Sequence, residues 1–383
     1  MSADSNLRGA IFEELVAHFA RQAGYAVCEA DVGDEQLYSR GGMPMVHGLG
    51  EGHNADVLLV PPMTLPMTPD TRLLVECKGY AGRVGLDVIR GAITIRNDLN
   101  AYKRLSPNLL EERRAGRRRL PIEVFPYYHV AVAGLHGFSG PAQTLAATYH
   151  VELLDYQRLP ILGRLPDLVS GLRFAVGIKS SESENIRDLT PAQGAVLRVR
   201  QAMSAALQSE VAGPLSERLR DEPWIDDRLF SDLHEILDIA LRVQACYSVT
   251  LPDGTSLLML AQKPIELDPG VTENFEFSIS YDRASMSWEL HVRAARLQFQ
   301  LPPELFRAWR EGDFTRRAAS AIKREHFNQV ELFGFIHNVR TRKEELRHVR
   351  GYLAQQSLQR TAVDWEEAQK RSKRRSLTDG PKF

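Results

Sequence analysis

Cysteine is scarce in this chain, and the few cysteines lie far apart. The 383 residues include three of them, Cys28, Cys77 and Cys246, in no CxxC arrangement. Their scarcity and spacing argue against a disulfide framework and against a cysteine-based zinc site. The chain also lacks a long uninterrupted apolar run, and its start, MSADSNLRGA, has no basic, apolar leader. We therefore expect a cytoplasmic protein with no membrane partner.

The chain also lacks an excess of charge of either sign. Lys and Arg number 48 against 49 Asp and Glu, a formal net charge of -1. No overall field then attracts a polyanion, so any contact with nucleic acid must come from local patches. Hydrophobic residues make up 43% of the chain, which is enough for a sizeable core. A length of 383 residues favours two domains, or three.

Helix and strand patterns alternate over residues 1–165. Apolar residues recur at helical spacing from Leu7 to Phe19, and Gly24 fits the end of that helix. Residues 33–54 are rich in glycine and polar groups and predict a loop, or a loop around one short strand. Apolar segments then predict strands at 55–60 and 72–78, a helix at 84–105 and two further strands before residue 165. The pattern predicts a mixed α/β fold.

The composition suggests three further segments. Residues 166–190 include SSESEN and predict a linker or connecting arm. Residues 191–340 combine helices with alternating strands and predict an α+β domain for target recognition or partner docking. The pattern predicts a helix from Thr190-Pro191 to about residue 209, a helix from Ile225 to about Ala245, and two longer strands, FEFSISY and WELHVRAARLQFQL. Residues 341–383 predict a basic helix and tail. We recognise no family in the C-terminal half.

Two short segments raise the question of function. LLVECKGY, residues 73–80, ends a strand with Glu76 and Lys78, and HNADVLLV places Asp56 before another strand. Alternation along a strand puts Glu76 and Lys78 on one face and Cys77 on the other. If the two strands pair as a hairpin, Asp56 approaches Glu76, and two adjacent carboxylates favour a hard cation such as Mg²⁺. A salt-bridge set on strand ends is the alternative.

These residues resemble the PD-(D/E)xK nuclease superfamily, and more narrowly the Mrr-like restriction endonucleases. Phe12-Glu13 and Gly24-Tyr25-Ala26-Val27 are similar to that family's first helix, and Asp56 and Glu76-Cys77-Lys78 are similar to its strand motifs. VHGLGEGHNADVL, with Gly48, Gly50 and His53, is similar to a GRGxxHQID variant, in which Asn54 replaces the Gln. The resemblance covers about residues 7–165 and implies a restriction-endonuclease-like mixed-sheet core. A long Pro/Met insert between Asp56 and Glu76 departs from the usual pattern.

The resemblance also implies a role for each residue. Asp56, Glu76 and the backbone carbonyl of Cys77 would hold Mg²⁺, with Mn²⁺ as an alternative ion. Glu13 would complete the outer metal shell, and a solvated helix charge is the alternative for it. Lys78 would act on the attacking water or on the scissile phosphate. His53 would orient Asp56 or touch a phosphate, and a purely structural loop histidine is equally compatible with the sequence.

A basic segment adds a candidate nucleic-acid surface. EERRAGRRRLP, residues 111–121, contains five arginines that could line a phosphate backbone: Arg113, Arg114, Arg117, Arg118 and Arg119. An exposed loop of mixed charge is the alternative.

On the first helix, Glu14 lies beside Glu13 in the sequence, and we expect its side chain to be solvated.

The sequence therefore favours a Mg²⁺-dependent DNA endonuclease that hydrolyses phosphodiester bonds, in restriction or phage defence by resemblance. One alternative is an effector subunit of a defence complex, active on DNA or RNA only when its partner is triggered and docked through the C-terminal half. Another is a nucleic-acid-binding module without activity. Homo-oligomerisation stays open.

Overall fold

The computed structural model describes two compact units, Met1–Gln244 and Ala245–Phe383. The residues described are 2–28, 36–40, 43–62, 70–105, 126–157, 159–174, 190–252, 256–268, 274–282 and 287–354. Each unit combines helices with strands, so the predicted mixed α/β character is confirmed. In the described ranges, no helix is both long and apolar enough to cross a membrane.

A five-stranded mixed sheet forms the centre of the first unit. Its strands are β1 (Ala26–Val27), β5 (Val57–Val60), β6 (Thr71–Lys78), β7 (Tyr127–Gly134) and β8 (Glu152–Asp155), in that spatial order. The pairs β1–β5 and β5–β6 are antiparallel, and β6–β7 and β7–β8 are parallel. The predicted hairpin between the two strands that flank the Pro/Met insert is therefore confirmed.

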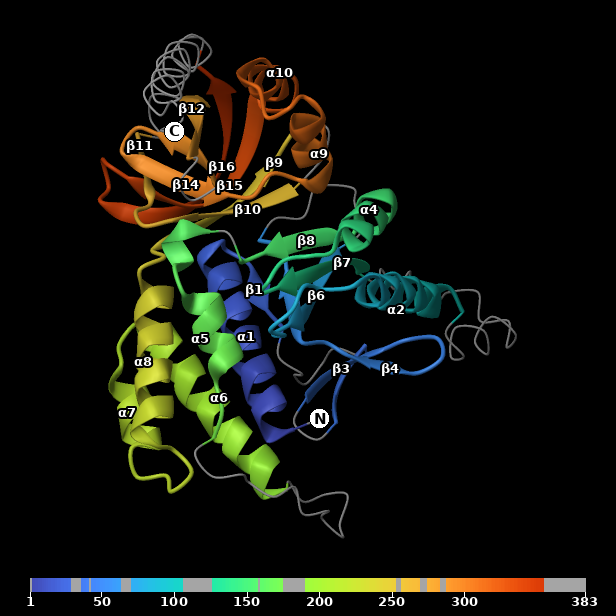
Figure 1. Cartoon of the computed structure of the whole chain (residues 1–383), viewed down its shortest axis with the longest axis vertical. Coiled ribbons are helices and arrows are strands. Elements are labelled where there is room, and N and C mark those ends of the chain that lie inside the picture. Colours follow the sequence, from blue (N-terminus) through green and yellow to red (C-terminus); the bar gives the residue numbers. More distant parts are fainter. Residues whose placement is uncertain are drawn as a thin grey trace, which may run out of the picture. The chain divides into compact units, whose positions relative to one another are not determined.

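Helices cover both faces of this sheet (Figure 1). Helix α1 (Ala3–Gln22) packs on one face, and α2 (Leu86–Leu105) and α4 (Gly140–Tyr149) pack on the other. On the α2 side, apolar side chains of the sheet and the two helices form one buried cluster, which includes Leu74, Ile89, Val130 and Ala142. Helix α1 buries apolar residues along most of its length, because it lies between the sheet and further helices.

Three short strands between residues 37 and 54 form a small sheet, where the sequence predicted a loop around at most one strand. Strands β2 (Leu37–Arg40), β3 (Met43–His47) and β4 (Gly52–Asn54) pair antiparallel in that order. Val46 of β3 joins the buried cluster under α2, which explains why this glycine-rich segment is ordered into strands.

The first unit continues well past the predicted boundary at residue 165. It includes the 3₁₀ helix η1 (Pro160–Leu162), α5 (Leu165–Gly171), α6 (Pro191–Ser209), α7 (Gly213–Leu219) and α8 (Asp227–Leu241). The division of the chain falls between Gln244 and Ala245, so the predicted borders at 165 and 190 are not where the structure divides it.

The first part of the predicted linker is a packed helix. Leu168 and Val169 of α5 are buried. Two hydrogen bonds then fasten the following residues to α1: the Arg8 side chain donates to the Leu172 carbonyl, and the Phe174 N–H donates to Asp4. Residues 175–189, with SSESEN, lie outside the described residues.

Helix α6 forms as the sequence predicted. Thr190 and Gln193 make a capping box, and Pro191 occupies the first turn. One face of α6 is rich in buried small residues, including Ala195, Ala202 and Ala206, which allow close packing on α1. A helix that sequence patterns assign to another domain is therefore a neighbour of α1.

The second unit contains a closed ring of seven strands. Neighbours around the ring are β15, β16, β12, β13, β14, β10 and β9, and β9 pairs again with β15. Strand β11 pairs in parallel with the last residues of β15, Ile336 to Asn338. The bounds are β9 Ala245–Thr250, β10 Ser256–Ala261, β11 Ile265–Leu267, β12 Asn274–Asp282, β13 Ser287–Val292, β14 Ala295–Phe299, β15 Gln329–Asn338 and β16 Lys343–Leu353. Two helices, α9 (Pro303–Glu311) and α10 (Arg316–His326), lie between β14 and β15 in the chain.

Two predictions for the second unit are wrong. The segment WELHVRAARLQFQL forms a hairpin of β13 and β14, with Arg293 at φ 50°, and not one long strand. The segment from Lys343 to Leu353 is strand β16, and not a helix. The spacing of its charged residues also suits a helix. As a strand, however, the segment pairs with β15 from Gln329 to Asn338, and this pairing satisfies its backbone hydrogen-bonding groups. Residues 355–383 lie outside the described residues.

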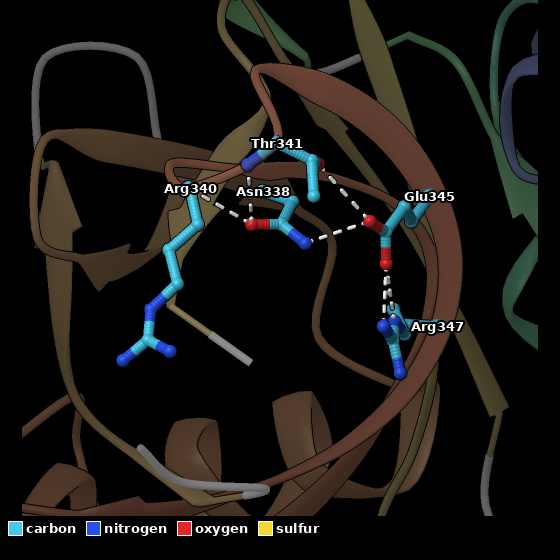
Figure 2. A network of polar contacts seen from close by, with 5 residues as sticks. All are labelled: Asn338, Arg340, Thr341, Glu345 and Arg347. Carbon is cyan, nitrogen blue, oxygen red and sulfur yellow. Dashed lines mark hydrogen bonds and ion pairs between the residues drawn. The ribbon is translucent and has the colours of Figure 1, made fainter. Parts of the chain in front are cut away.

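A polar network holds the turn between β15 and β16 (Figure 2). The buried Asn338 accepts hydrogen bonds from the backbone N–H groups of Arg340 and Thr341 and donates to Glu345. Glu345 also accepts from the Thr341 hydroxyl and from Arg347. Asn and Asp side chains stabilise tight turns in this way, so the network fixes the register of the long hairpin.

Candidate active site

Asp56 and Glu76 face each other across the β5–β6 hairpin. The antiparallel register pairs Val57 with Val75, which puts Asp56 directly opposite Glu76. Asp56 Oδ2 accepts a hydrogen bond of 2.8 Å from the backbone N–H of Cys77, and Asp56 Oδ1 accepts one of 3.3 Å from Asn54. The hairpin therefore holds the Asp56 carboxylate in a defined direction.

Glu76 and Lys78 form a half-buried ion pair on one face of β6. The Lys78 ammonium donates to Glu76 Oε1, and each side chain is less than one-fifth exposed. Burial acts to lower the pKa of Lys78, but the charges of Glu76 and Asp56 outweigh it, so that pKa is raised. Lys78 is therefore a cation at neutral pH.

Cys77 lies on the opposite face and is buried, as the strand alternation predicts. Burial raises the pKa of its thiol well above the usual value, and the charges of Asp56 and Glu13 add to this effect. A thiol of this kind is not a nucleophile near neutral pH, so the side chain belongs to the core.

Glu13 of α1 reaches the same group of charges. Burial and the Asp56 carboxylate raise the pKa of Glu13 to about 8, and Arg200 acts in the opposite direction. Burial and Glu76 raise the pKa of Asp56 to about 6, while Lys78, the Cys77 N–H and Arg200 lower it. These mutual effects require proximity, so the fold brings together all four predicted residues: Glu13, Asp56, Glu76 and Lys78.

Two participants were not predicted. Arg200 of α6 forms ion pairs of 2.8 Å with both Glu13 and Glu14. Glu14 was expected to be solvated, and that prediction is wrong, because Glu14 is buried against Arg200. Arg200 lies 186 residues beyond Glu14. No local sequence pattern could have connected the two residues. An arginine in the middle of α6, on a mostly apolar face, is only a weak sign of such a contact.

The group holds more negative than positive charge. Glu13, Glu14, Asp56 and Glu76 supply four formal negative charges, and Lys78 and Arg200 supply two positive ones, which leaves −2. In a half-buried place such an excess is relieved by a bound proton or by a bound cation. The raised pKa of Glu13 reflects the first of these. When all four carboxylates are ionised, a bound divalent cation would offset the two excess negative charges.

The donor atoms suit Mg²⁺ in kind, since they are carboxylate oxygens. They are not gathered around one point, however: over the described ranges, no three His, Cys, Asp or Glu side chains lie close enough together to hold a metal ion. The hydrogen bonds explain why. Asp56 is engaged by Cys77, Glu76 by Lys78 and Glu13 by Arg200. Glu76 and Glu13 would have to leave these cations, at least in part, to meet at one ion.

His53 has a different partner from the expected one. Its ring nitrogen Nε2 lies 2.6 Å from Asp98 Oδ2 of α2, and the Gly50 N–H donates to the other oxygen of Asp98. Asn54, the next residue, is the one that contacts Asp56. His53 therefore fastens the small sheet to α2, which agrees with the structural alternative. The arginines at 113, 114, 117, 118 and 119 lie outside the described residues.

Comparisons with known proteins assign no family. No family model matches the chain, and no curated protein matches it. A crystal structure of a protein of unknown function is 14% identical, with a TM-score of 0.28, over 62% of this chain and 98% of the other. A similarity of this size assigns neither a fold nor a function.

Proposed function

We propose that this chain is a Mg²⁺-dependent endonuclease that hydrolyses phosphodiester bonds in DNA, built on a restriction-endonuclease-like core. The observation that carries the proposal is the half-buried group of four carboxylates with an excess of two negative charges, beside Lys78, at the β5–β6 hairpin. The residues that meet there are the ones that carry the resemblance to the Mrr-like endonucleases: Glu13, Asp56, Glu76 and Lys78. A role in restriction or phage defence rests on the family resemblance alone.

Each residue of the group has a task in this reaction. Asp56 and Glu76, with the Cys77 carbonyl, would hold the ion, and Glu13 would hold its outer shell. The ion would supply charge neutralisation and an acidified water. If Glu76 held the ion, Lys78 would lose its present partner, and its ammonium would become available to a phosphate oxygen or to the attacking water. One movement of Glu76 would therefore complete the metal site and free the Lys78 ammonium.

A plasmid assay tests the proposal. Purified full-length protein is incubated with supercoiled DNA in Mg²⁺, in Mn²⁺, in Ca²⁺ and in EDTA, with Glu76→Gln as the inactive control. We expect nicked or linear product with Mg²⁺ or Mn²⁺ only, and none from the variant. Equal cleavage by the variant would contradict the assignment of the site.

The same assay separates the alternatives of substrate and partner. A single-stranded RNA is tested in parallel, because the proposed site would act on a phosphodiester, which DNA and RNA share. Cleavage that appears only after addition of extract from a host cell would favour the effector-subunit alternative. A wild-type chain that neither cleaves nor binds divalent cations would contradict the proposal altogether.

A further inference from the structure

Arg200 of α6 pairs with two carboxylates of α1. Its Nη1 lies 2.8 Å from Glu13 Oε2, and its Nε lies 2.8 Å from Glu14 Oε1, so one guanidinium bridges two successive carboxylates of α1. The three side chains are 30%, 17% and 10% exposed, respectively. A planar guanidinium can hold two carboxylates at once, whereas a lysine ammonium presents a single point charge.

The position of this guanidinium is set by the packing of α6. Val199 and Met203, on either side of Arg200 in the sequence, are buried, and α6 packs directly on α1. Arg198, two residues earlier, is very different: its side chain is 62% exposed and pairs with Glu222. The two arginines on one helix therefore offer a matched comparison of a site contact and a surface contact.

The charge of Arg200 acts on the candidate active site itself. Glu13 binds Arg200 directly, and Asp56 is close enough for its charge and that of Arg200 to affect each other. A divalent cation that approaches Asp56 and Glu13 would meet a positive charge already bound to Glu13. Two cations that share one carboxylate repel each other, and the repulsion is strong where water is largely excluded.

We propose that Arg200 is a resident counter-cation of this site, which holds Glu13 in the metal-free protein and competes with the divalent cation for it. This inference rests on the proposed function, since it concerns the same carboxylates. Arg200 is then a positioning residue, and not a catalytic one. It keeps Glu13 and Glu14 paired and in place until an ion arrives, at the expense of affinity for that ion.

The competition predicts opposite effects on metal affinity and on metal-free stability. In full-length Arg200→Met, Mg²⁺ should bind roughly tenfold more tightly, because a nearby like charge is gone. The melting temperature in EDTA should fall by roughly 5 °C, because two half-buried carboxylates lose their partner. A purely structural arginine would lower stability and leave metal affinity unchanged or weaker.

The experiment is calorimetric titration of Mg²⁺ without DNA, with melting curves in EDTA and in Mg²⁺. Arg198→Met is the control and should match the wild type in metal affinity within about twofold, since an exposed ion pair contributes little. Arg200→Lys keeps the charge and should keep metal affinity near wild type while it loses part of the stability. If Arg200→Met does not fold, Glu14→Gln takes its place: freed from Glu14, Arg200 should bind Glu13 more fully and weaken Mg²⁺ binding.

The outcomes separate this inference from the proposed function. Wild-type binding and cleavage with Mg²⁺, together with unchanged or weaker affinity in Arg200→Met, would overturn the counter-cation and leave the nuclease proposal standing. Unchanged affinity in Glu14→Gln would overturn it in the same way. A wild-type chain that binds no divalent cation would overturn both proposals.

Discussion

At the scale of single residues, the candidate site is a set of charges that satisfy one another. Lys78 pairs with Glu76, Arg200 pairs with Glu13 and Glu14, and a backbone N–H engages Asp56. Each contact stabilises the metal-free fold. Each contact also engages a side chain that the proposed reaction needs at the metal ion or at the phosphate. Activity should therefore require these side chains to leave their present partners.

Lys78→Ala should separate binding from chemistry. The variant keeps every candidate metal ligand and loses a positive charge, so its affinity for Mg²⁺ should equal or exceed that of the wild type. Cleavage should fall about 10²–10³-fold, because the lost group acts on the developing charge in the transition state. Titration of Mg²⁺, DNA binding in Ca²⁺ and a cleavage time course measure the three quantities. Wild-type cleavage rates would mean that Lys78 is only the salt-bridge partner of Glu76.

The pKa of Asp56 predicts a pH dependence of stability. An acid whose pKa is raised to about 6 in the fold binds a proton more tightly than in the unfolded chain, so its contribution is full below the ordinary pKa and is lost as pH rises through 6. Between pH 5 and pH 8 in EDTA, Asp56→Asn should therefore gain about 1 kcal/mol of stability relative to the wild type. Denaturant melts of both proteins at the two pH values measure this. A constant difference between them would contradict the burial of an unbalanced carboxylate at this position.

At the scale of elements, the ring of strands in the second unit closes where the backbones of β9 and β15 lie close together. Gly334 of β15 lies opposite Tyr247 of β9, in the pair that completes the ring. A Cβ at Gly334 would lie 2.6 Å from the Tyr247 ring and 2.8 Å from the Cys246 carbonyl oxygen. Glycine is therefore needed at this position, because there is no space for a side chain.

Gly334→Ala should destabilise the second unit by about 1–3 kcal/mol, because the clash includes a backbone atom that cannot rotate away. Gly194→Ala is the matched control: apart from the adjacent residues and backbone of α6 itself, no atom lies within 4 Å of the added Cβ, and alanine favours a helix by up to about 1 kcal/mol. The two substitutions should shift the melting temperature in opposite directions. A neutral effect of Gly334→Ala would show that β9 and β15 can separate without loss of stability.

At the scale of the whole molecule, the division between Gln244 and Ala245 matters for the site. Helices α5 to α8 belong with the β5–β6 hairpin, and α6 supplies Arg200. A fragment that ends near residue 165 would have Glu13, Asp56, Glu76 and Lys78 and lack the helix that covers α1. Apolar residues of α1 would then be exposed to water.

Fragments test this division. Residues 1–244 should be monodisperse and should unfold cooperatively, whereas residues 1–165 should aggregate or unfold without a clear transition, because the face of α1 that packs on α6 is uncovered. Size-exclusion chromatography and thermal melts compare the two. A well-folded 1–165 fragment would restore the border that the composition suggests.

The sequence by itself determined the local helices and strands, and it brought together two residues on neighbouring strands. Helical spacing predicted α1, α2, α6 and α8, and alternation predicted the β5–β6 hairpin, because these patterns act within one element or between neighbours in the chain. Asp56 and Glu76 could therefore be brought together from their position at the two strand ends alone.

Only the tertiary structure decided the contacts between distant segments. Arg200 meets Glu13 because α6 packs on α1, β16 is also held as a strand by the distant β12, and β2, β3 and β4 form because Val46 enters a core built by other elements. No sequence window contains both partners of such a contact. Their free energy comes from burial and pairing in the complete fold, which exceeds the small local preferences that a window can detect.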